Sequence, residues 1–388
     1  MPSLRETLVR TPFGEFSIDR YPTDDPAELR AWDAADELVL AHVGELRQPL
    51  SRVVIANDGF GALAVTMAAH GARVTSVCDS YLAQTGAKRA ARNNGVSLDD
   101  SHFTSTLGLG DLAAEPADLV MIKIPKSLDH LQFQLHALRS HIGASTIVLG
   151  AGMTKQIHRS TIELFETAIG PTHTSRAVKK ARLVVATPAP RLDSASTNKW
   201  PHQRFDETTG LQVANWPGVF SPDRTDRATQ LLVANLPSMS PNSVAVDLGC
   251  GTGIIGTYVA RHNSCQVICV DESLLALRSA RATASANDID EDRLRCIAGN
   301  GMCDWVEPRP PTVDWIFTNP PFHGGAAQDR SIATRWFKES RQVLSPRGQL
   351  WVVANRHLGY HTAMKRVFGN CDLIASDPAF VVLRSTGR

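Results

Sequence analysis

The most constraining feature of this sequence is an approximate internal repeat of about 190 residues. An apolar run followed by glycines occurs twice, at Val53–Gly61 and at Val244–Gly251. Further landmarks follow in the same order in each half, at spacings of 190, 192, 194 and 196 residues: Asn57 and Asp247, Asp79 and Asp271, Asn93 and Asn287, Lys123 and Asn319. This slowly drifting register favours tandem duplication of one α/β unit over two unrelated α/β domains.

The second half indicates how this unit folds. Apolar segments expected to be strands, at 244–248, 266–270, 313–317 and 349–354, alternate with segments of helical periodicity at 254–259, 274–287 and 333–343. Such alternation predicts a mostly parallel sheet with helices on both faces. The last apolar segments flank Asp377-Pro378, a turn too short for a crossover helix. The sheet should therefore end in an antiparallel hairpin.

Length and composition narrow the class of protein. A chain of 388 residues suits two domains, which we place at 1–195 and 196–388, joined by the Pro-, Ser-, Thr- and Ala-rich segment 187–198. Forty Lys and Arg against 39 Asp and Glu give no indication of a partner bound by bulk charge, such as an anionic membrane, so any nucleic-acid surface must be a local patch. Scattered cysteines without a CxxC pair favour reduced thiols in the cytoplasm and no metal site. We expect no membrane span.

A glycine-rich loop follows the first strand of the second half and opens a helix. The loop reads Asp247-Leu-Gly249-Cys250-Gly251-Thr-Gly253. Glycines let ligand atoms approach the backbone, and the first N–H groups of the helix are free to bind them. Asp271 ends the next strand, at close to the spacing of a carboxylate that bonds a ribose. The pattern predicts an adenosine-containing cofactor at these strand ends.

Two cofactors fit this loop. The segment Gly251–Gly256 matches the GxGxxG pattern of dinucleotide sites, which is a weak signal alone. The leading carboxylate, Asp247, suits the ammonium group of S-adenosylmethionine, whereas it would repel a pyrophosphate. We therefore expect S-adenosylmethionine rather than NAD, with a glycine turn that binds nothing as the remaining alternative.

A second motif follows the strand at 313–317. It reads Thr318-Asn319-Pro320-Pro321-Phe322-His323. The amide oxygen of Asn319 and a backbone carbonyl can both accept from the exocyclic amine of a base and direct its lone pair at a methyl group. Prolines stiffen such a loop and donate no competing N–H, and Phe322 can stack on the base. Positioning of this kind needs no strong base. The alternative is a rigid turn without a chemical role.

Asn-Pro-Pro-Phe loops of this kind resemble those of methyltransferases that act on amino groups of adenine, guanine or glutamine. The tandem layout narrows the resemblance to the bacterial ribosomal RNA guanine-N2 methyltransferases, and within them to the large-subunit branch. Three further segments carry it: Trp32–Glu37, Pro217–Ser221 and Val353–Leu358. The resemblance covers nearly the whole chain.

The resemblance implies two tandem class I, Rossmann-like methyltransferase domains that methylate N2 of one guanine in 23S ribosomal RNA. Residues 319–322 would orient and stack the guanine. The resemblance assigns S-adenosylmethionine to this set: Asp247, Gly249, Cys250, Gly251, Gly253, Asp271, Glu272, Asn300 and Asn319. Asp226 aligns with an acidic residue of the family, but Ala228 replaces a glycine of the family pattern.

The first half departs from this pattern where chemistry would occur. In the register above, Asn57 takes the place of the leading aspartate, Leu63 that of the third glycine, and the segment 123–126 that of the Asn-Pro-Pro-Phe tetrapeptide. We therefore expect that this half does not methylate, and that it binds RNA or supports the second half.

Charged side chains give weaker signals. One group could form an RNA-facing patch or an ordinary solvated face: Lys123, Lys126, Lys179, Lys180 and Arg182. We expect an ordinary exposed helix face from Arg335, Lys338 and Arg341 and a structural role for His357.

Three other functions stay open at this point. The substrate could be 16S ribosomal RNA, or the reaction could be glutamine-N5 or adenine-N6 methylation, although those enzymes usually carry Tyr at the position of Phe322. The chain could also be an RNA-binding protein that keeps the fold without catalysis. A base must leave its stack to reach such a loop, which favours a single-stranded or loop target. Internal duplication suits a monomer.

Overall fold

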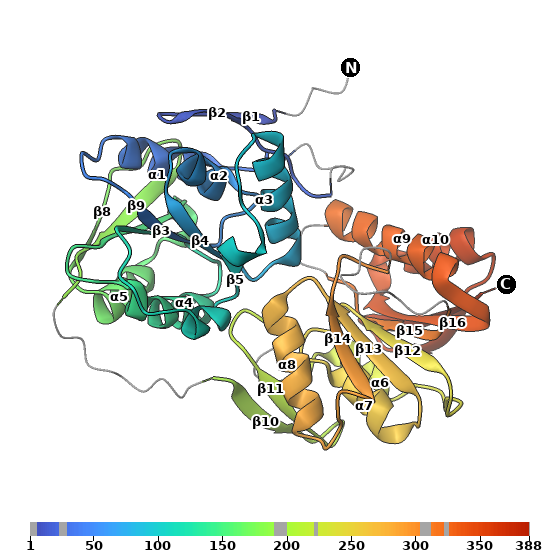
Figure 1. The fold of residues 1–388 in the computed structure, drawn as a ribbon. Helices are drawn as coiled ribbons and strands as arrows, with labels where there is room; N and C mark the ends of the chain where they lie inside the picture. Colours follow the sequence, from blue (N-terminus) through green and yellow to red (C-terminus); the bar gives the residue numbers. More distant parts are fainter. Residues whose placement is uncertain are drawn as a thin grey trace. The chain divides into compact units, whose positions relative to one another are not determined.

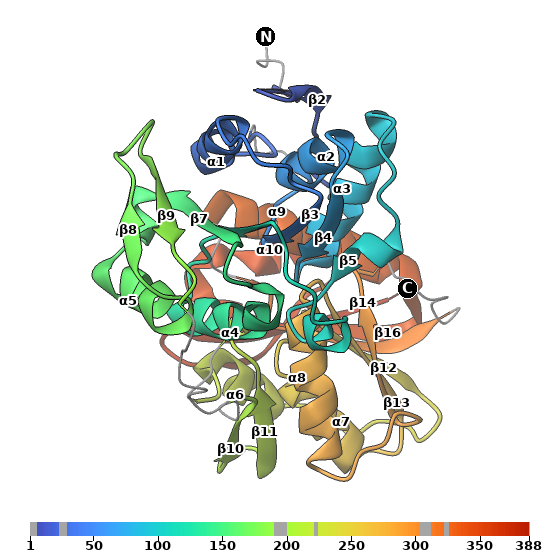
Figure 2. The same cartoon turned by 60° about the vertical axis from the view of Figure 1, so that its left-hand side comes forward.

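The computed structural model describes residues 6–22, 29–189, 200–220, 224–302, 312–321 and 326–387, with the backbone alone at 326–329. The chain divides into two compact units, residues 1–197 and 198–388. Each unit is a twisted sheet with helices on both of its faces (Figures 1 and 2). Most of the expected linker, 187–198, lies outside the described residues.

Unit 1 starts with a hairpin and continues with alternating strands and helices. Its strands are β1 (Leu8–Thr11), β2 (Gly14–Ser17), β3 (Arg52–Ala56), β4 (Arg73–Val77), β5 (Phe103–Thr104), β6 (Leu119–Lys123), β7 (Ile147–Met153), β8 (Thr172–Thr174) and β9 (Ala181–Ala186). Its α-helices are α1 (Ala34–Gly44), α2 (Ala62–Ala69), α3 (Tyr81–Asn93), α4 (Leu128–Leu138) and α5 (Arg159–Ala168). The main sheet has the order β5-β4-β3-β6-β7-β9-β8, with β9 antiparallel to both neighbours and the other pairs parallel.

Unit 2 repeats this plan. Its strands are β10 (His202–Asp206), β11 (Leu211–Asn215), β12 (Val244–Leu248), β13 (Gln266–Asp271), β14 (Leu294–Ala298), β15 (Val313–Thr318), β16 (Leu344–Asn355), β17 (Asp372–Ser376) and β18 (Phe380–Thr386). Its α-helices are α6 (Arg227–Val233), α7 (Ile254–His262), α8 (Leu274–Ser285), α9 (Ala326–Val343) and α10 (Tyr360–Phe368). The order β14-β13-β12-β15-β16-β18-β17 corresponds strand by strand to that of unit 1.

Alternation along the buried strands divides the core of unit 2 into two layers. Ala245 of β12 packs with α6, α7 and α8, whereas its neighbour Val246 packs with α9 and α10. Unit 1 has the same division, with α1, α2 and α3 on one face and α4 and α5 on the other. The predicted α/β class, the mostly parallel sheet and the closing antiparallel hairpin are therefore confirmed in both units.

Some elements differ from the sequence expectations. The edge strand β14 and the hairpin β10–β11 were not predicted, because charged and polar residues interrupt their apolar positions. Helix α9 begins at Ala326 rather than 333, and β16 begins at Leu344 rather than 349.

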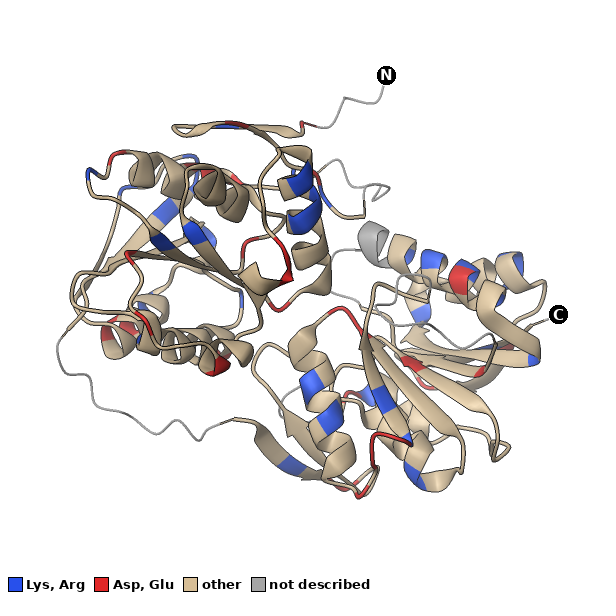
Figure 3. Cartoon of the chain, viewed as in Figure 1, with Lys and Arg blue, Asp and Glu red and all other residues tan. Residues whose placement is uncertain are grey.

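Lys/Arg and Asp/Glu are interspersed over the ribbon of each unit (Figure 3). No described helix is long and apolar enough to cross a membrane.

The described cysteines are all free thiols. They are Cys78, Cys250, Cys265, Cys269, Cys296 and Cys371. Over the described parts of the chain, no cluster of three or more His, Cys, Asp or Glu side chains could hold a metal ion.

The structure corrects the register of the repeat at the first loop. Gly61 and Gly253 are the N-caps of α2 and α7, and both are left-handed, with φ of 97° and 74°. Asn57 and Gly249 both have positive φ, and each donates its N–H to the carbonyl of the neighbouring strand's residue, Val77 and Val270. The counterpart of Asn57 is therefore Gly249.

Two pairings inferred from the sequence are consequently wrong. Asn57 does not take the place of Asp247, and Leu63 does not take the place of the third glycine, because Gly61 occupies that position. The error arose because the glycine-rich stretches align almost as well when shifted by two residues.

The second landmark also shifts by one residue. Ser80 and Ser273 cap α3 and α8 in the same way, each accepting from the backbone N–H three residues later. The counterpart of Asp79 is therefore Glu272, not Asp271. Lys123 and Asn319 correspond as expected, because Ile122 and Thr318 hold the same register against β3 and β12.

An asparagine at the end of one helix attaches the leading hairpin to each unit. In unit 2, Asn287 accepts from the N–H of Gln212 (3.0 Å) and donates to the carbonyls of Gln212 (2.7 Å) and Thr283 (2.7 Å). In unit 1, Asn94 makes the same three bonds to Ser17 and Ala90. The counterpart of Asn287 is thus Asn94 rather than Asn93, and the hairpin belongs to the repeat.

This attachment predicts a measurable stability effect. Replacing Asn287 with Ala removes these three hydrogen bonds and a fourth, which Asn287 accepts from Arg261 (3.4 Å), and it leaves two backbone groups of Gln212 without their partner. We therefore expect the free energy of unfolding to fall by about 1–3 kcal/mol. Urea denaturation measures the change. The control is Asn235→Ala, which removes one bond within its own helix and should cost less than about 1 kcal/mol. Equal losses in the two variants would contradict the attachment.

Candidate active site

The two sequence motifs meet at the carboxyl ends of the central strands of the unit 2 sheet. Strand β12 lies between β13 and β15 and is parallel to both. The loops that follow these three strands therefore leave the sheet side by side, at the point where the strand order reverses. Ligands of open α/β sheets bind at such switch points.

The glycine loop has a backbone that other residues rarely adopt. Gly253 is left-handed, and a Cβ there would lie 2.6 Å from the Cβ of Ala280 on α8, so no side chain fits. Gly251 is also left-handed, with φ of 52°, but a Cβ there would meet no atom of the described residues within 4 Å. The loop is therefore pressed against α8 at one glycine and open at the other, where a ligand can approach the backbone.

Asp247 carries a carboxylate that is only half satisfied. The residue is 1% exposed. Its Oδ2 accepts from the N–H of Gly256 (2.8 Å), while Oδ1 is buried without a hydrogen-bond partner in the part of the chain that is described. Burial, opposed by the Gly256 hydrogen bond and assisted by the charge of Asp271, raises the pKa of Asp247 to about 7. The free oxygen suits a buried cation.

Asp271 links the end of β13 to the glycine loop. Its two oxygens accept from the N–H groups of Gly251 (2.9 Å) and Ser273 (2.9 Å). Burial nevertheless raises its pKa above the usual range. Each carboxylate oxygen can accept a second hydrogen bond, so Asp271 can hold the loop and a ribose hydroxyl together. Glu272 is the next residue in the chain.

Two other predicted cofactor residues have partners of their own. Asn300, which is 7% exposed, accepts through its backbone O (2.9 Å) and Oδ1 (2.6 Å) from Arg335 of α9. Arg335 is thus not on an ordinary exposed face, as the sequence suggested; it holds Asn300. Burial raises the pKa of the Cys250 thiol to about 12, so this side chain stays protonated. His357 is exposed, in the turn Arg356–Leu358.

Asn319 follows β15 and has a fixed amide orientation. Its Nδ2 donates to Oδ2 of Asp226 (2.9 Å) and to Oγ1 of Thr229 (3.1 Å). A carboxylate can only accept, so the amide cannot flip. Its Oδ1 is buried and lacks a hydrogen-bond partner among the described residues. The arrangement leaves one oriented acceptor for an outside donor.

The surrounding loop is anchored at its start. Thr318 donates to the carbonyl of Leu248 (2.7 Å), which ties the end of β15 to the end of β12. Pro320 is buried and Pro321 is exposed. Phe322, the predicted stacking residue, lies outside the described residues.

Sequence reasoning missed two side chains around the site. Thr229 of α6 shares the Asn319 amide with Asp226. Trp336 of α9 packs against the glycine loop and against the segment after β14, because a Cβ added to Gly249 or to Gly301 would lie 3.0 Å from its side chain. A lone Thr or Trp on a helix carries no spacing signal, so only the packing identifies them.

Asn215 at the end of β11 is a third residue that the sequence did not indicate. It is 2% exposed, and its Oδ1 and Nδ2 both lack partners within the described parts of the chain. Leu211 and Val213, on the same face of β11, pack on Ile254, which directly follows Gly253. The face that carries Asn215 is therefore turned toward the glycine loop.

The duplication supports this placement. Asn215 lies three residues after Gln212, which binds Asn287. Arg20 lies three residues after Ser17, which binds Asn94, so Arg20 is the counterpart of Asn215 in unit 1. The guanidinium carbon of Arg20 lies 5.0 Å from the ring centre of Phe60, which precedes the N-cap glycine of α2. Phe60 corresponds to Thr252 of the glycine loop, so the repeat independently places Asn215 beside that loop.

In unit 1 the corresponding positions are filled by the chain itself. Lys123, the counterpart of Asn319, forms ion pairs with Asp33 (2.7 Å) and Asp36 (2.8 Å). Asp33 is the N-cap of α1 and Asp36 lies three residues later, just as Asp226 and Thr229 do on α6. Lys123 therefore does not belong to an RNA-facing patch.

The first amides of α2 are also occupied. Asp58, which is 3% exposed, accepts from the N–H groups of Gly61 (3.3 Å), Leu63 (3.2 Å) and Ala64 (2.7 Å). A carboxylate of the protein itself thus holds the helix N-terminus that an anionic ligand group would use. Together with Arg20 on Phe60, it closes the equivalent of the unit 2 site.

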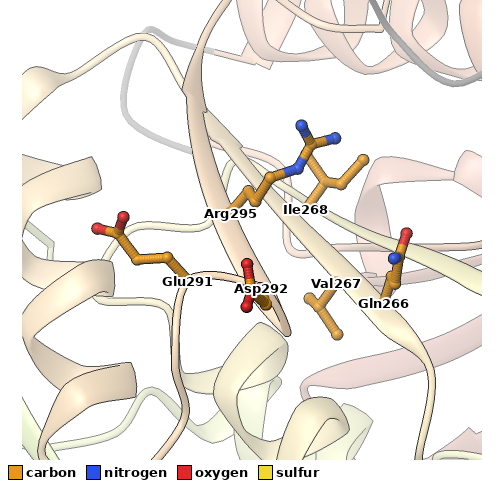
Figure 4. A pocket seen from close by; sticks show the side chains of 6 residues that line it. All are labelled: Gln266, Val267, Ile268, Glu291, Asp292 and Arg295. Atoms are coloured by element: carbon orange, nitrogen blue, oxygen red, sulfur yellow. The ribbon is translucent and has the colours of Figure 1, made fainter.

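A cavity elsewhere in unit 2 is separate from this site. It measures about 350 Å³ and is lined by Gln266, Val267, Ile268, Glu291, Asp292 and Arg295. Figure 4 shows these side chains around the starts of β13 and β14. The cavity is therefore at the amino ends of the strands, opposite to the two loops.

Comparison with known proteins gives a consistent family. Residues 6–190 match the family model of the RLMG N-terminal domain, and residues 210–384 match the methyltransferase small domain. Ribosomal RNA large subunit methyltransferase G of Streptomyces avermitilis is 41% identical, over 97% of this chain and 98% of that protein. The proteins of the same name from Streptomyces coelicolor (40%) and Stutzerimonas stutzeri (36%) each match over 97% of this chain and 99% of their own length.

A solved structure shares the whole fold. The T. thermophilus 16S rRNA N2 G1207 methyltransferase, solved in complex with AdoMet and guanosine, has a TM-score of 0.76. It is 21% identical, and the match covers 98% of each chain. With the full-length relatives at 36–41% identity, these findings establish that the chain belongs to the family of ribosomal RNA large subunit methyltransferase G.

Proposed function

We propose that unit 2 transfers a methyl group from S-adenosylmethionine to the exocyclic N2 amine of one guanine in 23S ribosomal RNA. The observation that carries the proposal is the oriented, partnerless Oδ1 of Asn319 beside the glycine loop. The full-length relatives, named ribosomal RNA large subunit methyltransferase G, support a large-subunit RNA substrate rather than 16S RNA. No feature of the site favours glutamine or adenine over guanine.

The residues of the glycine loop fit S-adenosylmethionine. The free Oδ1 of Asp247 suits the ammonium group of its methionine part, and the half-used carboxylate of Asp271 suits the ribose hydroxyls. Asn215 adds a donor and an acceptor, both buried without partners among the described residues. When bound, this cofactor would supply an electrophilic methyl group: its methyl–sulfur bond would break as the bond to N2 forms, leaving S-adenosylhomocysteine, and N2 would lose one proton to water. The predicted contacts of Gly249, Gly251, Gly253, Cys250, Glu272 and Asn300 remain part of the proposal.

Asn319 would position the N2 amine of the guanine and would not deprotonate it before methyl transfer. Its Oδ1 would accept one N2 hydrogen, and a backbone carbonyl of the same loop would accept the other, which draws the nitrogen toward tetrahedral geometry. Asp226 and Thr229 act as positioning residues because they fix the amide. Pro320 and Pro321 restrict the loop, and Phe322 would stack on the guanine. Orientation supplies much of the rate enhancement in such a step.

The division of labour between the units belongs to the same proposal. The predicted domain 196–388, which contains unit 2, is the catalytic one. The predicted domain 1–195, which lies within unit 1, neither binds the cofactor nor methylates, because Asp58, Arg20, Phe60 and the Lys123 ion pairs fill its counterpart site. A monomer then contains one active site.

The substrate assignment and the role of Asn319 are tested together. In cells that lack the protein, we expect 23S ribosomal RNA to lose one N2-methylguanosine, measured by nucleoside mass spectrometry. The wild-type chain should restore the modification. Asn319→Ala should not, because its turnover should fall by about 100-fold or more. Isothermal titration should show nearly unchanged affinity of this variant for S-adenosylmethionine.

The matched control is Asp79→Ala, which alters the counterpart of Glu272 in unit 1 and should leave turnover unchanged. Loss of the modification from 16S rather than 23S RNA would replace the substrate assignment. Full activity of Asn319→Ala would refute the mechanism.

The raised pKa of Asp247 predicts a pH dependence of cofactor binding. Below pH about 7 this carboxyl is protonated in the free protein, and an ammonium ligand needs it ionised. Binding should therefore release a proton, so affinity should rise by at most about tenfold per unit between pH 5 and 7 and then level off. Titration calorimetry in buffers of different ionisation enthalpy measures both quantities.

Asp247→Asn should bind more weakly and lose this pH dependence. The control is Asp58→Asn, since Asp58 also has a raised pKa, about 6, but lies in unit 1. Its affinity and pH dependence should match those of the wild type. An unchanged pH profile in Asp247→Asn would exclude Asp247 as the ammonium partner.

Replacing Asn215 should affect the melting temperature and the affinity for S-adenosylmethionine differently. Asn215→Leu replaces a buried amide without partners by an apolar side chain of similar volume, so the melting temperature of the free protein should stay equal or rise. Affinity for S-adenosylmethionine should fall about tenfold, corresponding to one lost hydrogen bond or more. Thr257→Val is the control. It removes a buried hydroxyl that, like the Asn215 amide, has no hydrogen-bond partner among the described residues, and it should keep full affinity. Wild-type affinity in Asn215→Leu would remove Asn215 from the site.

A further inference from the structure

The hairpin between β8 and β9 of unit 1 ends in a concentration of positive charge. Residues 176–180 are all exposed, and Arg182 on β9 is exposed as well. Arg176, Lys179, Lys180 and Arg182 thus lie within seven residues without an intervening acid. Figure 2 shows the β8–β9 connection projecting from the sheet of unit 1.

The turn itself is an unusual one for lysine. Val178 and Ala181 exchange both backbone hydrogen bonds (2.9 and 2.8 Å), so Lys179 and Lys180 form the two-residue turn. Both are left-handed, with φ of 48° and 64°. Hairpin turns of this shape favour Asn-Gly, and a side chain with a Cβ raises their energy. Two lysines are therefore held at the tip against local preference, a sign of a role other than folding.

A neighbouring corner adds to this charge. The N–H of Thr154, which begins the turn after β7, donates to the carbonyl of Lys180 (2.8 Å), and the next residue is the exposed Lys155. Over the described residues, the ion pair recorded for this group is that of Lys179 with Glu37 of α1 (2.9 Å). We call Lys155, Arg176, Lys179, Lys180 and Arg182 the basic tip.

Unit 2 provides an internal comparison. Its corresponding hairpin, β17–β18, turns at Asp377–Ala379 and contains no lysine. Asp377 closes that turn by accepting from the N–H groups of Ala379 (2.7 Å) and Phe380 (2.6 Å), and it pairs with Arg227 of α6 (3.0 Å). One copy of the fold therefore has a neutralised turn and the other has the basic tip, although the strands around them correspond.

We propose that the basic tip binds the sugar–phosphate backbone of the ribosomal RNA whose guanine unit 2 methylates. The inference rests on the proposed function for the identity of the RNA. Closely spaced ammonium and guanidinium groups on a narrow hairpin match the phosphates of a nucleic-acid strand. A membrane surface is a poorer match, because Val178 is the one large apolar side chain exposed among residues 176–182, where insertion would need several.

The turn geometry allows a variant that removes charge without weakening the fold. Lys179→Asn with Lys180→Gly deletes two cations and installs the residue pair that the left-handed turn favours. The control, Arg47→Ala with Arg159→Ala, deletes two exposed cations elsewhere in unit 1. Both proteins are full length. The probe is 23S ribosomal RNA from cells that lack the protein, with binding measured by filter retention between 50 and 200 mM KCl.

We expect the tip variant to bind this RNA about tenfold more weakly and to lose about 1–2 from the slope of log K against log salt, because each phosphate contact contributes about 0.7–0.9. Its KM for RNA should rise, while kcat at saturating RNA and the affinity for S-adenosylmethionine stay at wild-type values. The control should match the wild type in all five quantities.

Three outcomes would overturn the proposal: unchanged RNA affinity and slope in the tip variant, an equal loss in the control, or a fall in kcat without a rise in KM. Failure of the proposed function is distinguishable, since the wild type would then transfer no methyl group to the RNA. The binding comparison between the two variants would still decide whether the tip contacts it.

Discussion

Two hydrogen bonds donated by one amide nitrogen determine the orientation of the Asn319 side chain in unit 2. Asp226 and Thr229, one turn apart at the start of α6, take both hydrogens of the Asn319 amide. The carbonyl oxygen is then left for another molecule, and no rotation of the amide can satisfy it locally. In the proposed mechanism, helix α6 and the end of β15 matter because they hold these three side chains in place.

The repeat shows how the corresponding position is built in unit 1. In unit 1, Lys123 and two carboxylates replace the Asn319 amide and its partners, and Asp58 occupies the helix N-terminus. Buried polar groups are normally paired, so partnerless ones need an explanation. In unit 2, Asp247 and Asn319 have such atoms near the loops where S-adenosylmethionine and guanine are proposed to bind. The contrast between the copies separates structural demands from functional ones.

Sequence reasoning reached the fold and both loops because their signals are local: buried strands read as apolar runs, and glycine or proline marks the turns after them. It placed Lys123 opposite Asn319 correctly. It misaligned Asn57 and Leu63, because backbone conformation rather than residue type decides which glycine caps the helix. It could not find Asn215 or Thr229, since their roles depend on contacts between segments distant in the chain. The sequence also did not show that Arg335 holds Asn300.

The asparagine that attaches each leading hairpin has an evolutionary consequence. Asn94 and Asn287 each bind a strand that precedes the sheet of their own unit, so the ancestral gene segment already included that strand when it was copied. Each unit therefore kept its own asparagine attachment, and side chains at the ends of its central strands could change without loss of that attachment. Because each unit has its own attachment, side chains around the ends of the central strands can change in one unit while the other unit keeps its arrangement.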